Sequence, residues 1–165
     1  MTRPASLSST LGLARLLGLL IPAGAMATAL VAQYGFDLAP CEMCWWQRYA
    51  HIAALVPALA AFAVRDPRAV RSLVLLAAAC VAISGLIGGY HAGVEYHWWQ
   101  GITTCSSIKL SGDPLDAILN APVIRCDVPA WTLFGISMAG YNFLGSLTAA
   151  LVIAVLAAKG GKAGK

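Results

Sequence analysis

Four stretches of the chain are apolar enough, and nearly long enough, to cross a lipid bilayer. They cover residues about 16–32, 49–64, 72–90 and 138–158. A spanning helix needs about 20 mostly apolar residues, because its backbone polar groups must be satisfied within the helix itself. Only 11% of the residues are charged, against about 25% in ordinary soluble domains. The sequence therefore predicts an all-α membrane protein, a single domain (1–165) built as a bundle of four transmembrane helices.

The distribution of charge predicts how the chain lies in the membrane. Eight of the eleven basic residues fall in the two terminal segments and in segment 65–71, whereas segments 33–48 and 91–137 hold six of the seven acidic residues. Because Lys and Arg are enriched in cytoplasmic loops, both termini are expected to be cytoplasmic. Segments 33–48 and 91–137 then form two extracytoplasmic loops, and all five Trp residues fall in them, as aromatic residues at a membrane interface do.

The net charge of +4 reflects this asymmetry between the two sides. A nucleic-acid-binding protein would instead gather its basic residues in one patch on a soluble face. We therefore expect the chain to contact membrane lipid, to bind no nucleic acid and to be monomeric.

Cysteines carry the chemistry that the sequence suggests. Four of the five lie in the two outer loops, Cys41 and Cys44 in the first and Cys105 and Cys126 in the second. A Cys-x-x-Cys pair beside a helix start has a lowered thiol pKa, because the helix N-terminus and nearby cations favour the anion. Cys44 directly precedes the second apolar stretch, and Arg48 follows about one helical turn later. This placement indicates a reactive pair.

Other interpretations of the cysteines stay open on spacing alone. Cys105 and Cys126 could form a structural disulfide that braces a loop, whereas a Cys-x-x-Cys ring is too small to constrain much of the unfolded chain. A zinc site made of the four outer cysteines would need a second closely spaced pair, which the chain lacks, so no metal is expected. Cys80, in the third apolar stretch, is expected to act as a small apolar residue.

Three short runs resemble one known family. The run PCEMCWWQR at 40–48 resembles the Pro-Cys-x-x-Cys-x-x-x-Arg motif of the disulfide-bond formation protein B (DsbB) family. YHAGVE at 90–95 is similar to the end of that family's third helix, and CDVPAWTLFGISM at 126–138 to its second essential cysteine and the start of its fourth helix. The likeness covers about residues 12–158. It implies a four-helix protein of the bacterial inner membrane, with redox loops that face the periplasm.

The resemblance also implies an activity. The protein would re-oxidise a periplasmic thioredoxin-like dithiol oxidase (DsbA) by disulfide exchange and pass the electrons to a membrane quinone, either ubiquinone or menaquinone. Cys105 would form the mixed disulfide with the partner and Cys126 would complete the second disulfide. Cys41 and Cys44 would be the pair next to the quinone.

The resemblance further implies which residues bind the quinone. Cys44 would meet the quinone ring, with Arg48 beside it and His91 close to the same pocket. Gln47 departs from the family pattern, because some members carry an acid before the arginine, and this puts an acid–base role at that position in doubt.

Several of these side chains also have a plainer interpretation. Arg48 could contact lipid phosphate at the interface, His91 could be an ordinary interfacial histidine, and His51 could hydrogen-bond a neighbouring helix. Residues 111–120 are predicted to form a short interfacial helix in the second loop, with Pro114 in its first turn.

Competing functions predict different cysteine positions. A vitamin K epoxide reductase-like thiol–quinone oxidoreductase would place its membrane-proximal Cys-x-x-Cys late in the chain, whereas here it follows the first apolar stretch. A cysteine-pair heavy-metal transporter would place cysteines within a span or on the cytoplasmic side, and only Cys80 lies so. A structural membrane protein with two braced loops is the third alternative.

Overall fold

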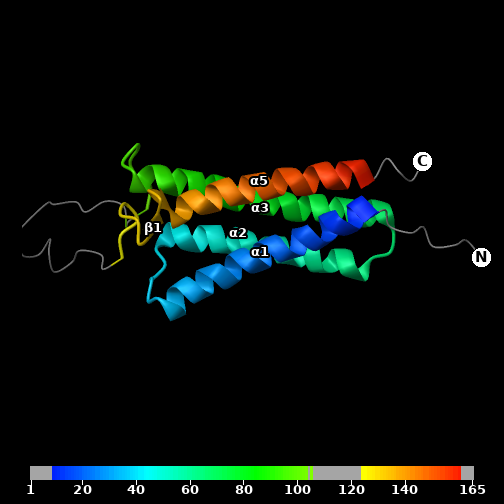
Figure 1. Ribbon diagram of the computed structural model, residues 1–165, viewed down its shortest axis with the longest axis horizontal. Helices are drawn as coiled ribbons and strands as arrows, with labels where there is room; N and C mark the ends of the chain where they lie inside the picture. The colour runs from blue at the N-terminus through cyan, green and yellow to red at the C-terminus, as the bar shows by residue number, and fades with distance from the viewer. Residues whose placement is uncertain (1–8, 104, 106–123, 161–165) are drawn as a thin grey trace, which may run out of the picture.

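The chain forms an elongated bundle of helices. The computed structural model describes residues 9–103, 105 and 124–160. Its helices are α1 (Ser9–Gly35), α2 (Glu42–Ala63), α3 (Pro67–Glu95) and α5 (Met138–Gly160), which run side by side (Figure 1). Within the described residues, α1, α3 and α5 are long and apolar enough to cross a membrane. The remaining helix, α2, is less apolar than these three, because Gln47, Arg48 and His51 lie in its first half.

The helices extend beyond the apolar stretches that predicted them. α1 begins at Ser9, before residue 16, and α3 runs from Pro67 to Glu95, beyond the limits 72–90. Hydropathy marks only the apolar part of a helix, whereas backbone hydrogen bonding continues through polar residues at its ends. The non-helical connection between α1 and α2 is therefore residues 36–41 alone, much shorter than the predicted loop 33–48.

One consequence is a correction to the position of Cys44. Cys44 was expected just before the second helix, but α2 already begins at Glu42, so Cys44 and Arg48 both lie on it. His91 lies within α3, at the helix end that the family resemblance indicates, and not in the second loop as the predicted limits 91–137 had it. The interfacial helix predicted at 111–120 lies outside the described residues.

A small hairpin, which the sequence did not predict, directly precedes α5. β1 (Thr132–Leu133) pairs antiparallel with β2 (Ile136–Ser137). Phe134 and Gly135 between them both have positive φ, 50° and 76°, as a type I′ turn requires. The Tyr96 hydroxyl donates to the carbonyl of Gly135 (2.9 Å) and accepts from the backbone N–H of Ser137 (2.7 Å). These two bonds fix the hairpin, and hence the start of α5, against the end of α3.

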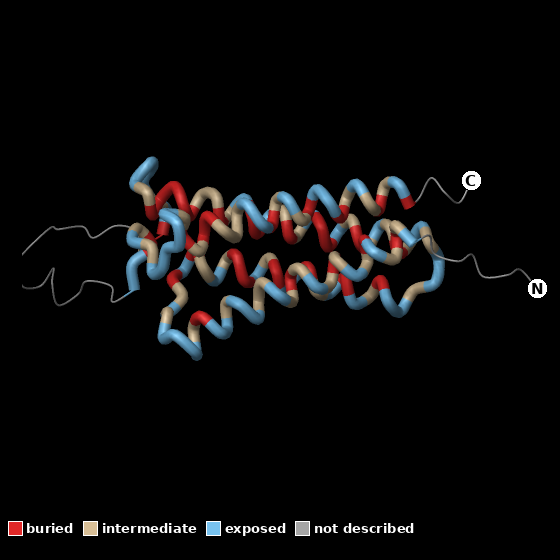
Figure 2. Tube along the Cα trace, viewed as in Figure 1, coloured by how far each residue is buried: buried red, intermediate tan, exposed pale blue. Residues whose placement is uncertain are grey.

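Burial follows the pattern of a helical bundle in lipid. Figure 2 shows buried residues along the inner helix faces and exposed residues along the outer ones. The outer faces carry large apolar side chains, and Leu20, Val56 and Leu151 are each more than half exposed. Soluble monomers rarely expose apolar surface on this scale. Small residues such as Ala54 and Ala78 fill much of the interior, which lets the helices approach closely.

The connections between the helices place the outer cysteines at one end of the bundle. The start of α1, the end of α5 and the α2–α3 connection lie together at the end opposite the hairpin (Figure 1). Near the α2–α3 connection the core contains an apolar cluster that includes Leu11, Val74 and Ile153. At the hairpin end the corresponding cluster contains Cys41 and Cys126. The cysteines that predicted the chemistry are therefore gathered at the hairpin end.

Candidate active site

Cys41 and Cys44 form a reduced pair at the N-terminus of α2. Cys41 is the N-cap residue, and its Sγ accepts a hydrogen bond from the backbone N–H of Cys44 (3.3 Å). The Cys41 thiol donates to Cys44 Sγ across 3.0 Å, and no disulfide joins the two. The positive end of the helix dipole lies at these sulfur atoms and favours the thiolate form.

The two thiols differ in their readiness to lose a proton. Both cysteines lie outside the predicted second membrane span, which begins at residue 49. The hydrogen bond donated by the Cys41 thiol holds the pKa of Cys44 far below its ordinary value, against the opposing effect of burial, and His91 lowers it further. The same hydrogen bond, together with burial, raises the pKa of Cys41. The pair is therefore best described as a Cys44 thiolate that accepts a hydrogen bond from a Cys41 thiol.

This asymmetry predicts an unusual pH dependence of alkylation. An ordinary thiol with a pKa of about 8.5 loses on the order of 10²-fold in reactivity between pH 9 and pH 6, because the thiolate disappears. Since the pKa of Cys44 is lowered, its thiolate persists over this range and its iodoacetamide rate, followed by mass spectrometry, should fall less than about threefold. Cys44 in the Cys41→Ala variant lacks the donated hydrogen bond and should lose more of its rate at pH 6. An ordinary pH profile in the unmodified chain would contradict this description of the pair.

His91 on α3 contacts this pair and is fully enclosed. Its ring is 2% exposed, with Nε2 at 3.5 Å from Cys41 Sγ and 3.6 Å from a carboxylate oxygen of Glu95. The side-chain amide nitrogen of Gln47 donates to the carbonyl of Met43 (3.1 Å) and lies 3.0 Å from His91 Nδ1. Because an amide nitrogen only donates, Nδ1 accepts and the ring proton is on Nε2. His91 therefore presents a hydrogen-bond donor toward the sulfur.

A network of polar side chains continues from His91 into the bundle. Asn142 on α5 donates through its amide nitrogen to Gln47 Oε1 (2.8 Å) and to Ser84. Ser84 donates in turn to the backbone carbonyl of Gln47 (3.0 Å). Asn142 Oδ1 accepts from Ser146 (2.7 Å) and lies 3.1 Å from His51 Nε2. These contacts join α2, α3 and α5 through buried polar groups, which are costly to leave unpaired.

Gly88 on α3 has no side chain, and this leaves the space that Asn142 and Gln47 occupy in the network. A Cβ at this position would lie 2.9 Å from the Ala139 carbonyl oxygen and 3.0 Å from the Asn142 amide nitrogen. Gly88→Ala should therefore destabilise the bundle by about 1–3 kcal/mol, because backbone or network atoms must move. Thermal unfolding in detergent measures the change. Gly145→Ala is a matched control, since nothing lies within 4 Å of a Cβ there; equal effects of the two substitutions would contradict the packing argument.

The second cysteine pair is oxidised and lies beside the first. Cys105 and Cys126 form a disulfide, and the backbone N–H of Cys126 donates to the carbonyl of Cys105 (3.1 Å). Cys126 shares one buried apolar cluster with Cys41, against which Cys44 and Cys105 also pack. The structure thus brings together the four cysteines of both predicted loops.

A zinc site built from the four outer cysteines does not match this arrangement, because two of its ligands are joined in a disulfide. A smaller group, Cys41, Cys44 and His91, has its ligand atoms within 4.8 Å of one another. Metal binding through His91 Nε2 would require the ring proton to move to Nδ1. Gln47 already presents an N–H there, so the network opposes a metal at this position.

Arg48 lies on the same helix but has different neighbours from those expected. Its guanidinium donates to the side chain of Gln33 and to the carbonyl of Ala29 (3.1 Å), both on α1, and lies 5.0 Å from the centre of the Trp45 ring. The side chain is 7% exposed. It is therefore anchored to α1 rather than extended toward lipid phosphate, and the Cys44 thiolate is stabilised by Cys41 and His91.

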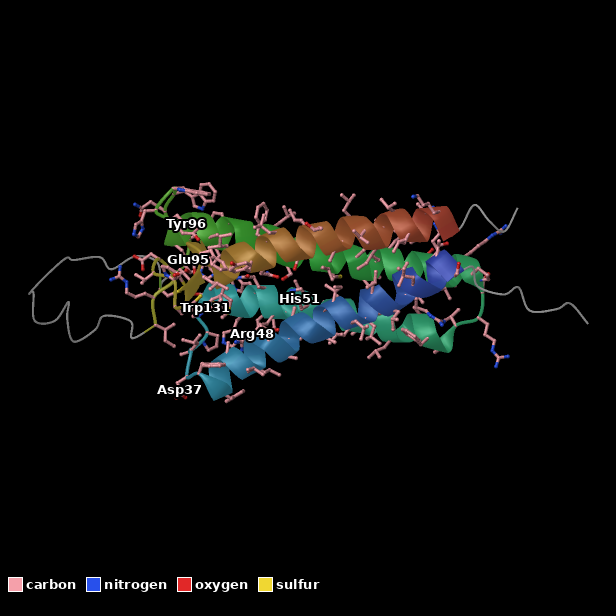
Figure 3. All side chains as sticks on the ribbon, viewed as in Figure 1. Asp37, Arg48, His51, Glu95, Tyr96 and Trp131 are labelled. Carbon is pink, nitrogen blue, oxygen red and sulfur yellow. A yellow bond between two sulfur atoms is a disulfide. The ribbon has the colours of Figure 1, made fainter. Side chains whose placement is uncertain are left out.

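A cavity of about 360 Å³ adjoins the reduced pair. Apolar residues of α1, such as Ile21 and Ala29, form one wall, and α5 contributes another. Cys44, Arg48 and His91 all line it. Figure 3 shows Arg48 and Glu95 toward the hairpin end and His51 farther along the bundle. The structure thus brings Cys44, Arg48 and His91 to one cavity and places Cys105 and Cys126 in the adjoining cluster.

Some residues of this site were not found from the sequence. Neither the cysteine spacing nor the family motif indicates Asn142 and Ser84, and Gln47 stands out only as a departure from a family pattern. Glu95, which is 8% exposed and close to His91, differs in the sequence from no other acid of the outer loop. Polar residues within otherwise apolar helices were the available signal, because such residues face the bundle interior and mark functional sites.

A helical membrane bundle that holds a reduced Cys-x-x-Cys pair against a disulfide is, by class, a membrane thiol–disulfide protein. Comparison with known families then defines it further. The model of the family described as disulfide bond formation protein DsbB matches residues 12–156, so the chain belongs to that family. It is a membrane disulfide oxidoreductase.

Individual relatives agree with this assignment. The chain is 33% identical over 136 residues to disulfide bond formation protein B of Shewanella frigidimarina, covering 77% of this chain and 78% of the relative. It is 29% identical over 141 residues to disulfide bond formation protein B of Chromohalobacter salexigens (74% and 82%). An uncharacterized protein of Rickettsia prowazekii is 28% identical over 126 residues (73% and 72%). No solved structure matches the chain.

Proposed function

We propose that the protein re-oxidises a thioredoxin-like dithiol oxidase, DsbA, and passes the electrons to a membrane quinone. One observation carries the proposal: the reduced Cys41–Cys44 pair lies between the Cys105–Cys126 disulfide and an apolar cavity. A pair in that position can exchange electrons with a disulfide on one side and with a lipid-soluble acceptor on the other. The comparisons support neither a heavy-metal transporter nor a vitamin K epoxide reductase-like protein.

The exchange with the partner is a sequence of thiolate attacks. A partner thiolate attacks Cys105 Sγ, the Cys105–Cys126 bond breaks, and Cys126 leaves as a thiolate. The partner's second thiolate then attacks its own bridged sulfur and releases Cys105. Two electrons have moved to the Cys105–Cys126 pair, and the partner is left with a disulfide. When Cys41 and Cys44 are joined by a disulfide, a thiolate of the now reduced Cys105–Cys126 pair attacks that bond and forms a mixed disulfide. The second thiolate of the same pair then attacks its own bridged sulfur, which re-forms the Cys105–Cys126 disulfide and returns Cys41 and Cys44 to the dithiol form observed here.

The cavity beside Cys44 fits a quinone head group. Its walls are largely apolar, and its polar groups come from a few side chains, as is usual for cofactor sites. A bound quinone would accept two electrons and two protons. Arg48 would bring a permanent positive charge and several N–H donors to its oxygen atoms. His91 would hold its Nε2 proton between the sulfur atoms and Glu95, where it stabilises the Cys44 thiolate.

The position of charged residues supports an orientation for this activity. Arg65, Arg68 and Arg71 lie at the α2–α3 connection, at the opposite end from the cysteines. By the positive-inside tendency, that end faces the cytoplasm and the cysteine end faces the periplasm of a bacterial inner membrane. Disulfides persist on that side.

A coupled turnover assay tests the proposal. The purified protein is mixed with ubiquinone or menaquinone and a reduced thioredoxin-like partner, and quinone reduction is followed together with loss of the partner's thiols. We expect one quinone reduced for each two thiols lost. Absence of quinone reduction, accompanied by tight binding of a soft metal ion, would overturn the proposal.

Replacing Arg48 should separate quinone use from partner binding. Arg48→His removes a permanent charge and should raise the KM for quinone by about 10- to 100-fold, the range for losing one or more charge-assisted hydrogen bonds. The KM for the partner should change less than about twofold. Arg48→Lys, which keeps the charge, is the matched control and should lose less. Equal increases in both KM values would instead favour a structural role through Gln33 and Ala29.

A further inference from the structure

His51 ends the polar network at a ring nitrogen whose hydrogen bonding is incomplete. The residue is 4% exposed and lines the same cavity as Cys44. Its Nε2 lies 3.1 Å from Asn142 Oδ1, whereas Nδ1 is buried and has no hydrogen-bond partner within the described part of the chain. A buried polar atom without a partner costs free energy unless a ligand or water supplies one.

The network determines which nitrogen of His51 carries the proton. Gln47 Nε2 donates to the Met43 carbonyl, which fixes that amide and leaves Gln47 Oε1 as an acceptor. Asn142 must then turn its amide nitrogen toward Gln47 Oε1, so its Oδ1 faces His51 and Ser146. An amide oxygen only accepts, and therefore His51 Nε2 must donate to it. On the uncharged ring, Nδ1 then carries a lone pair and no hydrogen.

A ligand that pairs with this lone pair must bring its own hydrogen. The carbonyl oxygen of an oxidised quinone has none, whereas each hydroxyl of the reduced quinol has one. Building on the proposed function, we propose that His51 Nδ1 accepts a hydrogen bond from a quinol hydroxyl, so that the cavity favours the reduced form of its ligand. His51 is thus a binding residue that distinguishes the two redox states.

The two buried histidines of the site therefore have opposite roles, set by the same pair of amides. Gln47 makes His91 a donor at Nε2, and Asn142 makes His51 an acceptor at Nδ1. A net hydrogen bond changes affinity by about threefold to tenfold. A tenfold preference for the quinol raises the two-electron potential of the bound ligand by about 30 mV. The direction of this change favours electron flow from the Cys41–Cys44 dithiol.

Two substitutions at His51 separate its two nitrogens. His51→Gln can keep a polar atom near the Nε2 position and its contact with Asn142, but leaves nothing at Nδ1. His51→Asn can place its side-chain oxygen near the Nδ1 position, but cannot reach Asn142 as Nε2 does. Both are made in a Cys41→Ser, Cys44→Ser background, in which no electrons pass between protein and ligand. Dissociation constants for decylubiquinone and decylubiquinol are then measured separately by calorimetry in nanodiscs.

We expect His51→Gln to weaken decylubiquinol binding by about threefold to tenfold and to leave decylubiquinone binding within about twofold. His51→Asn should retain most of the quinol preference. Equal effects of His51→Gln on both ligands, or no effect on either, would overturn the role of His51 while the proposed quinone activity stands. Failure of the background protein to bind either ligand would overturn both proposals.

A second measurement needs no substitution of His51 itself. ¹⁵N NMR of histidine-labelled protein distinguishes the two neutral tautomers and the charged ring. His97→Gln and His91→Gln, each used only for assignment, identify the signals of the other two histidines, so that the remaining signals belong to His51. We expect the proton of His51 on Nε2, and a change in the Nδ1 signal when decylubiquinol, but not decylubiquinone, is added. A proton on Nδ1, or a charged ring, would overturn the inference even where the His51 variants do not fold.

Discussion

Cys126→Ala should accumulate a covalent adduct with a thioredoxin-like partner, joined through Cys105. In this variant the Cys105 thiolate can attack the disulfide of an oxidised partner, and one partner sulfur leaves as a thiolate. In the unmodified chain Cys126 displaces the partner and re-forms the disulfide, because the two cysteines are adjacent. Acid quenching followed by non-reducing electrophoresis should show on the order of tenfold more adduct than the unmodified protein gives.

The complementary variant assigns the two cysteines their order. Cys105→Ala should give no adduct, since Cys126 is fully buried against Cys41 and its cluster. Peptide mapping of the adduct identifies the cysteine that is joined to the partner. An adduct on Cys126 in the Cys105→Ala variant would show that the two roles are reversed.

Cys44→Ser should abolish quinone reduction, with a loss of turnover of at least about 10³-fold, as is typical when a reacting nucleophile is removed. A serine hydroxyl cannot form a disulfide with Cys41 or carry electrons, although it can occupy a similar volume in the first turn of α2. Quinone reduction is followed by its absorbance with the reduced partner in excess. The first exchange should survive in this variant, so one equivalent of the partner should still be oxidised by the Cys105–Cys126 disulfide.

Cys80→Ser is the matched control for this prediction. Cys80 is also a free cysteine of the described chain, but it lies on α3 and packs against a different cluster from that of Cys41 and Cys44. Its replacement should leave turnover within about twofold. Comparable losses in the two variants would mean that Cys44 is not the residue through which electrons leave the protein.

The helices could be predicted from the sequence, but their ends could not. Four apolar stretches anticipated α1, α2, α3 and α5, because hydropathy sums over a segment and does not depend on its neighbours. Their limits depended on capping by single residues. Cys41 starts α2 at Glu42, and Asp66, which accepts from the backbone N–H groups of Arg68 and Ala69, starts α3 at Pro67. The hairpin at 132–137 is held by Tyr96, a contact between distant parts of the chain.

That the four outer cysteines lie together could also be predicted, whereas their environment could not. Their spacing and a family motif indicated Cys41, Cys44, Cys105 and Cys126, and the structure brings these four together. The contacts of Arg48 with Gln33 and Ala29 were not anticipated, since they depend on how α1 crosses α2. A motif gives the order of residues along one helix and says nothing about the helix that packs against it.

The sequence by itself determined that this protein is a helical membrane bundle with four of its five cysteines outside the predicted spans, because hydropathy and charge belong to segments of chain. Only the tertiary structure decided where the protons of the site lie. The bond from Asn142 to Gln47 joins residues 95 positions apart, and it turns Asn142 Oδ1 toward His51, whose Nε2 donates and whose Nδ1 is left as an acceptor. The amide nitrogen of Gln47 in turn leaves His91 a donor at Nε2. Hydrogen-bond direction in a buried network depends on every partner at once, and these partners come from three different helices.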